Sequence, residues 1–331
     1  MFILAAILAT ALPTVAYTLL IWWLDRYEKE PLGLLIAAFL WGMIPAVALA
    51  ALFGVVLKQP LASSPLGPGV LAWSIAPVVE EPIKAAALLA LFLVARRELD
   101  SPLDGIVYGS LIGFGFSMSE NLFYFLAFPH DFQALFWVRS VLFGLNHAFF
   151  TSIIGATLGA LRHAQARWVG YVALPLALLA AIGFHTLHNV AVHQRLPGLL
   201  ISWLVLVSGI LTIFGVAVLA WRHESRWIAA ELGEEIALGT LSTADYAQII
   251  SAPQRARSEI AALLDGGLRR FRQVTRLHQE LTKLAFQKYH LRRADPHQPP
   301  LDLNAQRRRI CALRAAIDID DLRLTINNRW P

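Results

Sequence analysis

Residues 70–95 read VLAWSIAPVVEEPIKAAALLALFLVA, and this stretch decides how the chain folds. It is longer than the roughly 20 mostly apolar residues that a helix needs to cross a bilayer. Three charged residues, Glu80, Glu81 and Lys84, nevertheless lie near its middle. A charge at the centre of a membrane helix costs about 2.5–3.5 kcal/mol on insertion scales, so such residues face other helices or a water-filled cavity. The stretch therefore predicts a membrane helix with a polar face inside a bundle.

Similar apolar stretches recur along the first two thirds of the chain. With 70–95 included, the predicted spans are residues 2–23, 33–57, 70–95, 103–127, 133–160, 169–193 and 198–221. Of the 331 residues, 57% are hydrophobic and only 15% are charged, whereas a soluble domain has about 25% charged residues. The sequence therefore predicts an all-α, polytopic transmembrane helix bundle with about seven spans.

The charge is distributed unevenly between two predicted domains. Residues 1–221, the transmembrane domain, carry ten basic and ten acidic residues, whereas the tail 222–331 carries 18 basic and 13 acidic residues. The tail therefore holds the whole formal charge of +5, and its periodicity predicts a partly helical segment. A basic segment beside a membrane favours anionic lipid headgroups, so we expect the lipid bilayer as a partner and no nucleic acid.

Short connections set the expected orientation in the membrane. Eight Lys and Arg residues flank the spans on the side that includes the start of the tail, and two flank them on the other side. Because positive residues concentrate in cytoplasmic loops, we expect a multi-pass protein of the cell membrane. Its N-terminus would lie outside and its tail in the cytoplasm.

Other polar residues interrupt the predicted spans at similar depths. They are Glu120 and Asn121 in 103–127, His147 in 133–160, and His185 and Asn189 in 169–193. At a rise of 1.5 Å per residue, the acids and histidines lie about 10 to 20 Å below the outer ends of their spans. We predict that they meet Glu80 around one water-filled cavity in the outer half of the membrane.

Two prolines bracket the acids of the first stretch. Pro77 precedes Glu80, and Pro82 follows Glu81. Proline removes a backbone donor and disturbs a helix, and broken backbone at membrane depth is tolerated only inside protein or beside a wet cavity. We therefore expect a disturbed helix here. Arg139, near the outer end of 133–160, receives no chemical role from the sequence.

The residue types allow two hydrolytic mechanisms. In one, Glu80 and Glu81 act as a general base on water, while His147, His185 and Asn189 stabilise an oxyanion. In the other, two histidines with one or two glutamates form a catalytic zinc set with an open position. The common helical zinc motif His-Glu-x-x-His is absent. The sequence leaves both mechanisms open.

Four motifs in order carry a resemblance to a known family. They are Glu80-Glu81-Pro82-Ile83-Lys84, Phe116 through Glu120-Asn121, His147, and His185 to Asn189. Their order and placement resemble those of the PrsW family of intramembrane proteases, over about residues 20–195. That family is similar to the wider clan of CAAX prenyl endopeptidases and bacteriocin-processing enzymes. The first loop, Asp25 to Pro31, is also PrsW-like.

The resemblance implies a membrane endopeptidase that cuts a membrane-protein substrate, such as a single-span anti-sigma factor, near the outer face. The implied catalytic residues are Glu80, Glu81, Glu120, His147 and His185, with Asn189 where some relatives have histidine. We predict that Phe116 and Asn121 contact the substrate. If the enzyme depends on a divalent metal such as zinc, His147 and His185 are the expected ligands.

Two other functions fit the same residues. A proton-coupled transporter also needs acids and histidines in one cavity. Such transporters often contain inverted repeats, and the sequence has none that we detect. The third reading is a non-catalytic membrane scaffold that signals through the basic tail.

Overall fold

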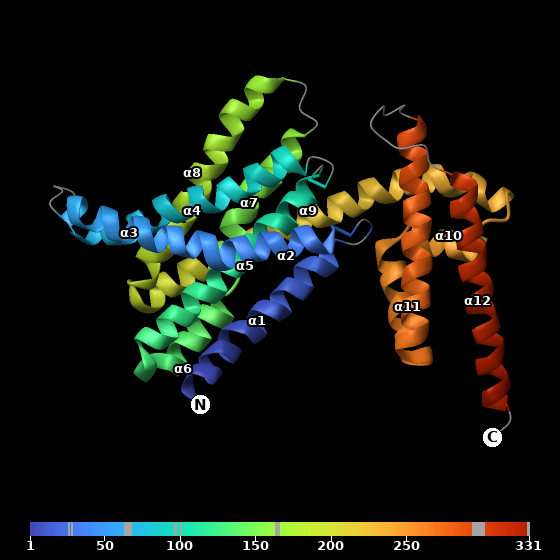
Figure 1. Ribbon diagram of the computed structural model, residues 1–331, viewed down its shortest axis with the longest axis horizontal. Coiled ribbons are helices and arrows are strands. Elements are labelled where there is room, and N and C mark those ends of the chain that lie inside the picture. Colours follow the sequence, from blue (N-terminus) through green and yellow to red (C-terminus); the bar gives the residue numbers. More distant parts are fainter. Residues whose placement is uncertain are drawn as a thin grey trace. The chain divides into compact units, whose positions relative to one another are not determined.

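The computed structural model describes the chain except residues 26, 28, 63–67, 96, 97, 100, 163–165, 293–301, 330 and 331. The side chains of 58–62, 68–72, 167, 290, 292 and 318–329 are also outside the description. The described residues form helices and no strand (Figure 1), which confirms the predicted all-α class.

The chain forms two compact units. The first, called here the membrane unit, comprises Met1–Asp25 and Lys29–Ala217, and the second, the C-terminal unit, comprises Arg26–Glu28 and Val218–Pro331. The helices of the membrane unit are α1 (Phe2–Leu24), α2 (Leu32–Trp41), η1 (Gly42–Ala46), α3 (Val47–Ala62), α4 (Pro68–Val94), α5 (Pro102–Ala127), η2 (Pro129–Asp131), α6 (Phe132–Leu135), η3 (Phe136–Leu142), α7 (Asn146–Leu161) and α8 (Arg167–Val192). Helix α9 (Arg195–Ala237) begins in this unit and ends in the C-terminal unit.

Five helical stretches in the described part of the chain are long and apolar enough to cross a membrane. They are Phe2–Leu24, Leu32–Leu57, Pro129–Leu161, Trp168–Val192 and Arg195–Ala237. The helices at the other two predicted spans, α4 and α5, are not among them. The chain is thus a helical membrane bundle, and the number of seven spans stays a prediction.

Helices α5 and α7 approach each other closely enough for their backbones to touch. A Cβ atom at Gly105 would lie 1.9 Å from the carbonyl oxygen of Gly155, and one at Gly113 would lie 2.4 Å from that of His147. Only glycine fits at such positions, and small residues permit this packing between membrane helices. The close approach holds His147 against α5, the helix that carries Glu120.

The predicted span 133–160 is not one continuous α-helix. The π-helix η3 precedes residues 143–145, and α7 then starts at Asn146. Short π-helical segments are frequent at functional sites because they shift the side chains that follow. The break places His147 in the first turn of α7 and Arg139 in the π-helix.

The expected disturbance at Pro77 and Pro82 does not end helix α4, which runs through both prolines. Pro77 has no N–H group, so the carbonyl of Trp73, four residues earlier, loses its usual helical donor. The side-chain amide of Asn189 on α8 donates to that carbonyl instead, at 3.2 Å. A neighbouring helix thus replaces the missing backbone hydrogen bond.

The C-terminal unit has its own hydrophobic core. Besides the end of α9 it contains α10 (Thr243–Ile249), α11 (Ala252–Arg292) and α12 (Leu303–Arg329), and α11 bends at Gly267, where φ is 66°. Its buried core residues are Tyr27, Ile228, Leu232, Leu241, Ile249, Ala252, Leu277, Leu281, Leu284, Ala285 and Ile310. The tail is therefore a packed helical unit, and residue 27 from the first loop belongs to it.

Candidate active site

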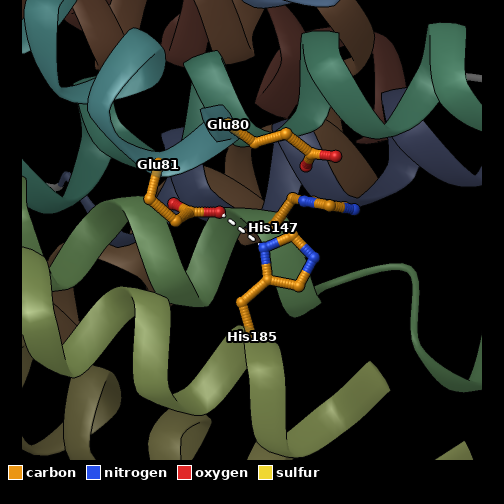
Figure 2. Close-up of side chains that lie close together, drawn as sticks. All are labelled: Glu80, Glu81, His147 and His185. Carbon is orange, nitrogen blue, oxygen red and sulfur yellow. Dashed lines mark hydrogen bonds and ion pairs between the residues drawn. The ribbon is translucent and has the colours of Figure 1, made fainter. Parts of the chain in front are cut away.

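Four side chains from three helices of the membrane unit form one cluster. Glu80 and Glu81 lie on α4, His147 on α7 and His185 on α8. Each offers one ligand atom, and these atoms all lie within 4.8 Å of one another (Figure 2). All four residues are buried. The structure thus brings together four of the residues that the sequence singled out.

Glu81 is the most enclosed member of this cluster. Its Oε1 atom accepts hydrogen bonds from Lys84 Nζ at 2.9 Å and from His185 Nδ1 at 2.8 Å. Figure 2 shows the contact with the histidine as a dashed line. Its other oxygen, Oε2, is buried and has no hydrogen-bond partner among the described residues. A buried acceptor without a partner is unfavourable, so this oxygen is available to a cation or a hydrogen-bond donor.

The contacts of His147 determine which ring nitrogen carries the proton. Nδ1 lies 3.0 Å from Lys84 Nζ, and Nε2 lies 3.0 Å from Glu120 Oε2. A lysine ammonium only donates, so Nδ1 accepts, and the neutral ring donates its Nε2–H to Glu120. The lone pair of Nδ1 therefore points to Lys84 Nζ, which also contacts Glu80 and Glu81.

Glu120 lies behind His147 and outside the four-residue cluster. Its Oε2 atom forms an ion pair with Arg139 Nη2 at 2.7 Å. Arg139 Nε also donates to Asn121 Oδ1 at 2.9 Å, and its guanidinium lies 3.7 Å from the ring centre of Tyr124. Arg139 and Glu120 thus form a charged support that orients the imidazole of His147.

Phe116 and Asn121, the predicted substrate contacts, are both buried. The centre of the Phe116 ring lies 3.9 Å from Lys84 Nζ and 5.2 Å from the centre of the His147 ring. Asn121 accepts from Arg139 and donates to Ser117 Oγ at 3.4 Å. Both residues pack against the site's charged groups, and a contact with substrate stays a prediction.

Asn189, the predicted oxyanion donor, contacts the backbone of α4. It is half-buried, its side-chain amide donates to the Trp73 carbonyl, and a role as oxyanion donor stays a prediction. His188 on the same helix bonds Ser202 Oγ through Nδ1 at 2.6 Å and is not one of the four cluster residues. Of the histidines on α8, His185 is the one that belongs to the cluster.

Sequence reasoning gave Arg139 no chemical role and did not place Lys84 beside His147. Lys84 contacts three of the four cluster residues, and Arg139 holds Glu120. Arg139 carried a usable signal, because an arginine inside an apolar stretch needs an acidic partner. Which acid it would meet depended on how α5 packs against η3.

The donor set fits a divalent metal ion. Two imidazoles and two carboxylates are ligands that zinc accepts, they are buried together, and Glu81 has an oxygen without a partner. These features define a class of protein, the polytopic helical membrane proteins with a buried Glu/His cluster that can bind a metal. A sequence profile described as the PrsW family intramembrane metalloprotease matches residues 30–221. The chain belongs to this family, which confirms the resemblance found in its motifs.

Three curated relatives are each named Protease PrsW. The protein from Geobacillus kaustophilus (strain HTA426) is 31% identical over 140 residues, which are 42% of this chain and 59% of the relative. The protein from Clostridioides difficile (strain 630) is 32% identical over 100 residues, 30% of this chain and 42% of the relative. The protein from Bacillus subtilis (strain 168) is 26% identical over 169 residues, 50% of this chain and 74% of the relative. No solved structure matches this chain.

Proposed function

We propose that this protein is an intramembrane endopeptidase that hydrolyses a peptide bond of a membrane-protein substrate. The observation that carries the proposal is the convergence of two glutamates and two histidines from α4, α7 and α8 inside a membrane bundle. Membership of the PrsW family supports peptide hydrolysis over proton-coupled transport. Buried ionisable groups at this depth are costly, which favours a catalytic use for them.

Glu80 is the best-placed general base. Its carboxylate contacts Lys84 Nζ at 3.3 Å, and 11% of its side chain remains exposed, whereas the side chain of Glu81 has no exposure. A base must reach an attacking water, so the more accessible carboxylate suits this role. Glu81 has the positioning task, because its Oε1 atom already binds both Lys84 and His185.

The tautomer of His147 favours metal binding over direct oxyanion stabilisation. Its one N–H group is donated to Glu120, so the ring keeps no N–H for an oxyanion and turns a lone pair toward the cluster. We therefore assign Glu81, His147 and His185 to hold a divalent cation such as zinc. Bound there, the ion supplies Lewis-acid polarisation of the scissile carbonyl and of water.

Glu120, Arg139 and Asn189 act through other residues. Glu120 and Arg139 keep the His147 ring in one orientation, and Asn189 holds α8 to α4 at the carbonyl freed by Pro77. This assignment places Asn189 among the residues that shape the site and keeps Glu120 in proton and ring positioning.

We infer a single-span anti-sigma factor as the substrate class, cut near the outer face of the cell membrane. The inference follows from the resemblance in the motifs and from the outer-half depth of the polar residues. It requires the N-terminus outside and the C-terminal unit in the cytoplasm. Reporter fusions at both ends of the chain test this orientation, and a cytoplasmic N-terminus would contradict it.

Cleavage of a tagged membrane substrate by the full chain in liposomes tests the activity. Glu80→Gln and His147→Ala should each leave the substrate intact. His188→Ala is the matched control, because it removes a histidine of the same helix as His185 that lies outside the cluster. Full cleavage by both site variants would falsify the assignment of this cluster as the active site.

A further inference from the structure

Lys84 lies where a cation bound by the cluster would find its ligands. Its Nζ atom is 2.9 Å from Glu81 Oε1, 3.0 Å from His147 Nδ1 and 3.3 Å from Glu80 Oε2. The residue has no exposure to solvent. Three of the four candidate ligand residues therefore each have a ligand atom in contact with one ammonium group.

An ammonium and a metal ion cannot use the same lone pairs together. Zinc needs nitrogen and oxygen ligands at about 2.0–2.2 Å. The candidate ligand atoms Glu81 Oε1 and His147 Nδ1 already accept hydrogen bonds from Lys84 Nζ. The imidazole nitrogen Nδ1 has a single lone pair. A metal ion on His147 Nδ1 therefore requires Lys84 Nζ to leave that atom.

We propose that the ammonium of Lys84 is a built-in cation that holds Glu80, Glu81 and His147 in place without metal, and that metal binding displaces it. This inference rests on the proposed function. Two buried carboxylates without a cation nearby would be costly, so Lys84 stabilises the metal-free site. The same contacts lower metal affinity, because they must be broken before the ion enters. Lys84 is thus a positioning residue that sets how tightly the site holds metal.

The surroundings offer the displaced ammonium a place to go. The face of the Phe116 ring already lies 3.9 Å from Nζ, and a cation over an aromatic face is attracted to it. Arg139 satisfies Glu120 independently on the far side of His147. Lys84 can therefore leave His147 without exposing another buried acid.

Metal affinity of the purified full chain in detergent or nanodiscs tests the proposal. Zinc binding is measured by competition with a chromophoric chelator, and its stoichiometry by elemental analysis. Lys84→Met keeps most of the length of the side chain and removes the charge, so it should bind zinc about tenfold more tightly or better, because a competing charge-assisted contact is gone. Lys288→Met is the matched control, since Lys288 is also buried and paired with Glu235, in the C-terminal unit. Its affinity should equal that of the wild type.

Lys84→Arg gives a second, independent readout if the methionine variant does not fold. A guanidinium donates from a planar fork and binds carboxylates in two places, so it should compete more strongly and weaken zinc binding. Equal affinity in wild type and Lys84→Arg overturns the proposal, as does a Lys84→Met protein that binds zinc no more tightly.

The outcome separates this inference from the proposed enzyme. If Glu80→Gln abolishes cleavage and Lys84→Met leaves zinc affinity unchanged, the endopeptidase stands and the role of Lys84 falls. If Lys84→Met tightens zinc binding while Glu80→Gln and His147→Ala still cleave, the metal site stands and the catalytic roles of Glu80 and His147 fall. A merely structural lysine would weaken zinc binding when removed, and would not strengthen it.

Discussion

Each unit of the molecule contains a buried carboxylate oxygen held between a basic side chain and a histidine, and only one of these arrangements is extended into a cluster. In the C-terminal unit, Glu259 Oε1 accepts from Arg255 Nε at 3.2 Å and from His278 Nδ1 at 3.0 Å. In the membrane unit, Glu81 Oε1 accepts from Lys84 at 2.9 Å and from His185 at 2.8 Å. The local chemistry is nearly the same.

The difference lies in what surrounds each arrangement. Around Glu259, Arg255 donates a further hydrogen bond to Thr282 Oγ1 at 3.1 Å, and Glu259 and His278 are not part of a larger acid and histidine group in the described chain. Around Glu81, a second acid and a second histidine add ligand atoms. The contact around Glu259 can stabilise the fold. The cluster around Glu81 has more ligand atoms than Lys84 needs, so it can also bind a metal ion.

The largest effect is expected from replacing one acid in each unit by glutamine. Glu80→Gln should lower the cleavage rate at least about 10²-fold, because it removes a general base. Glu259→Gln should lower the thermal midpoint of the protein and leave cleavage per folded molecule unchanged. Cleavage rates normalised to folded protein measure both. Equal losses of activity would erase the functional distinction between the two arrangements.

Metal removal should affect the cluster around Glu81 in the membrane unit and not the contact around Glu259. Dialysis against a chelator is expected to lower activity about 10²-fold or more, since Lewis-acid stabilisation is worth several kcal/mol, and added zinc should restore it. Elemental analysis before and after dialysis checks the metal content. Full activity in demonstrably metal-free protein would instead support the glutamate-and-water mechanism that the sequence left open.

Arg139 should affect the site through Glu120 and His147. Arg139→Met is expected to lower the cleavage rate about 10- to 100-fold, the usual cost of losing a group that orients a metal ligand. Arg139→Lys keeps the charge and should recover part of the rate. The zinc affinity of Arg139→Met should fall as well. A rate equal to that of the wild type would mean that His147 keeps its orientation without this support.

Asn189 distinguishes a helix contact from an oxyanion donor. Asn189→Ala frees the half-buried Trp73 carbonyl again and should reduce stability by up to about 1–3 kcal/mol, the cost of leaving a buried acceptor unsatisfied. Its cleavage rate per folded molecule should fall less than about tenfold, whereas loss of an oxyanion donor costs about 10²–10³ in rate. Denaturation and kinetics on the same samples decide between the two.

The smallest effect concerns the core of the C-terminal unit. Burial raises the pKa of Tyr27 to about 12, above the ordinary value of about 10. The folded state therefore favours the neutral phenol, and its stability contribution is complete below about pH 10 and is lost as pH rises toward 12. Tyr27→Phe cannot ionise, so the unfolding of its C-terminal unit should depend less on pH in that window. Identical alkaline unfolding curves would contradict this burial effect.

Some features of the site could be predicted from the sequence because they are local. Charged residues inside apolar stretches had to face the interior of a bundle, and this argument found Glu80, Glu81, His147 and His185. The same argument placed Asn189 with them, because spacing on one helix puts it on the face of His185. The structure pairs Asn189 with the carbonyl that Pro77 leaves free, a contact between two helices that no spacing reveals, and its role in catalysis stays a prediction.

The sequence by itself determined that this chain is an all-α membrane protein, that its net positive charge lies in the C-terminal part, and which family it resembles. These follow from composition, apolar length and motif order, which need no knowledge of packing. Only the tertiary structure decided that Lys84 sits among the ligand atoms, that Arg139 supports His147 through Glu120, and that Tyr27 belongs to the C-terminal core. The physical reason is that each of these contacts joins residues from separate segments. Their distances depend on how closely the helices approach, as the glycines between α5 and α7 allow.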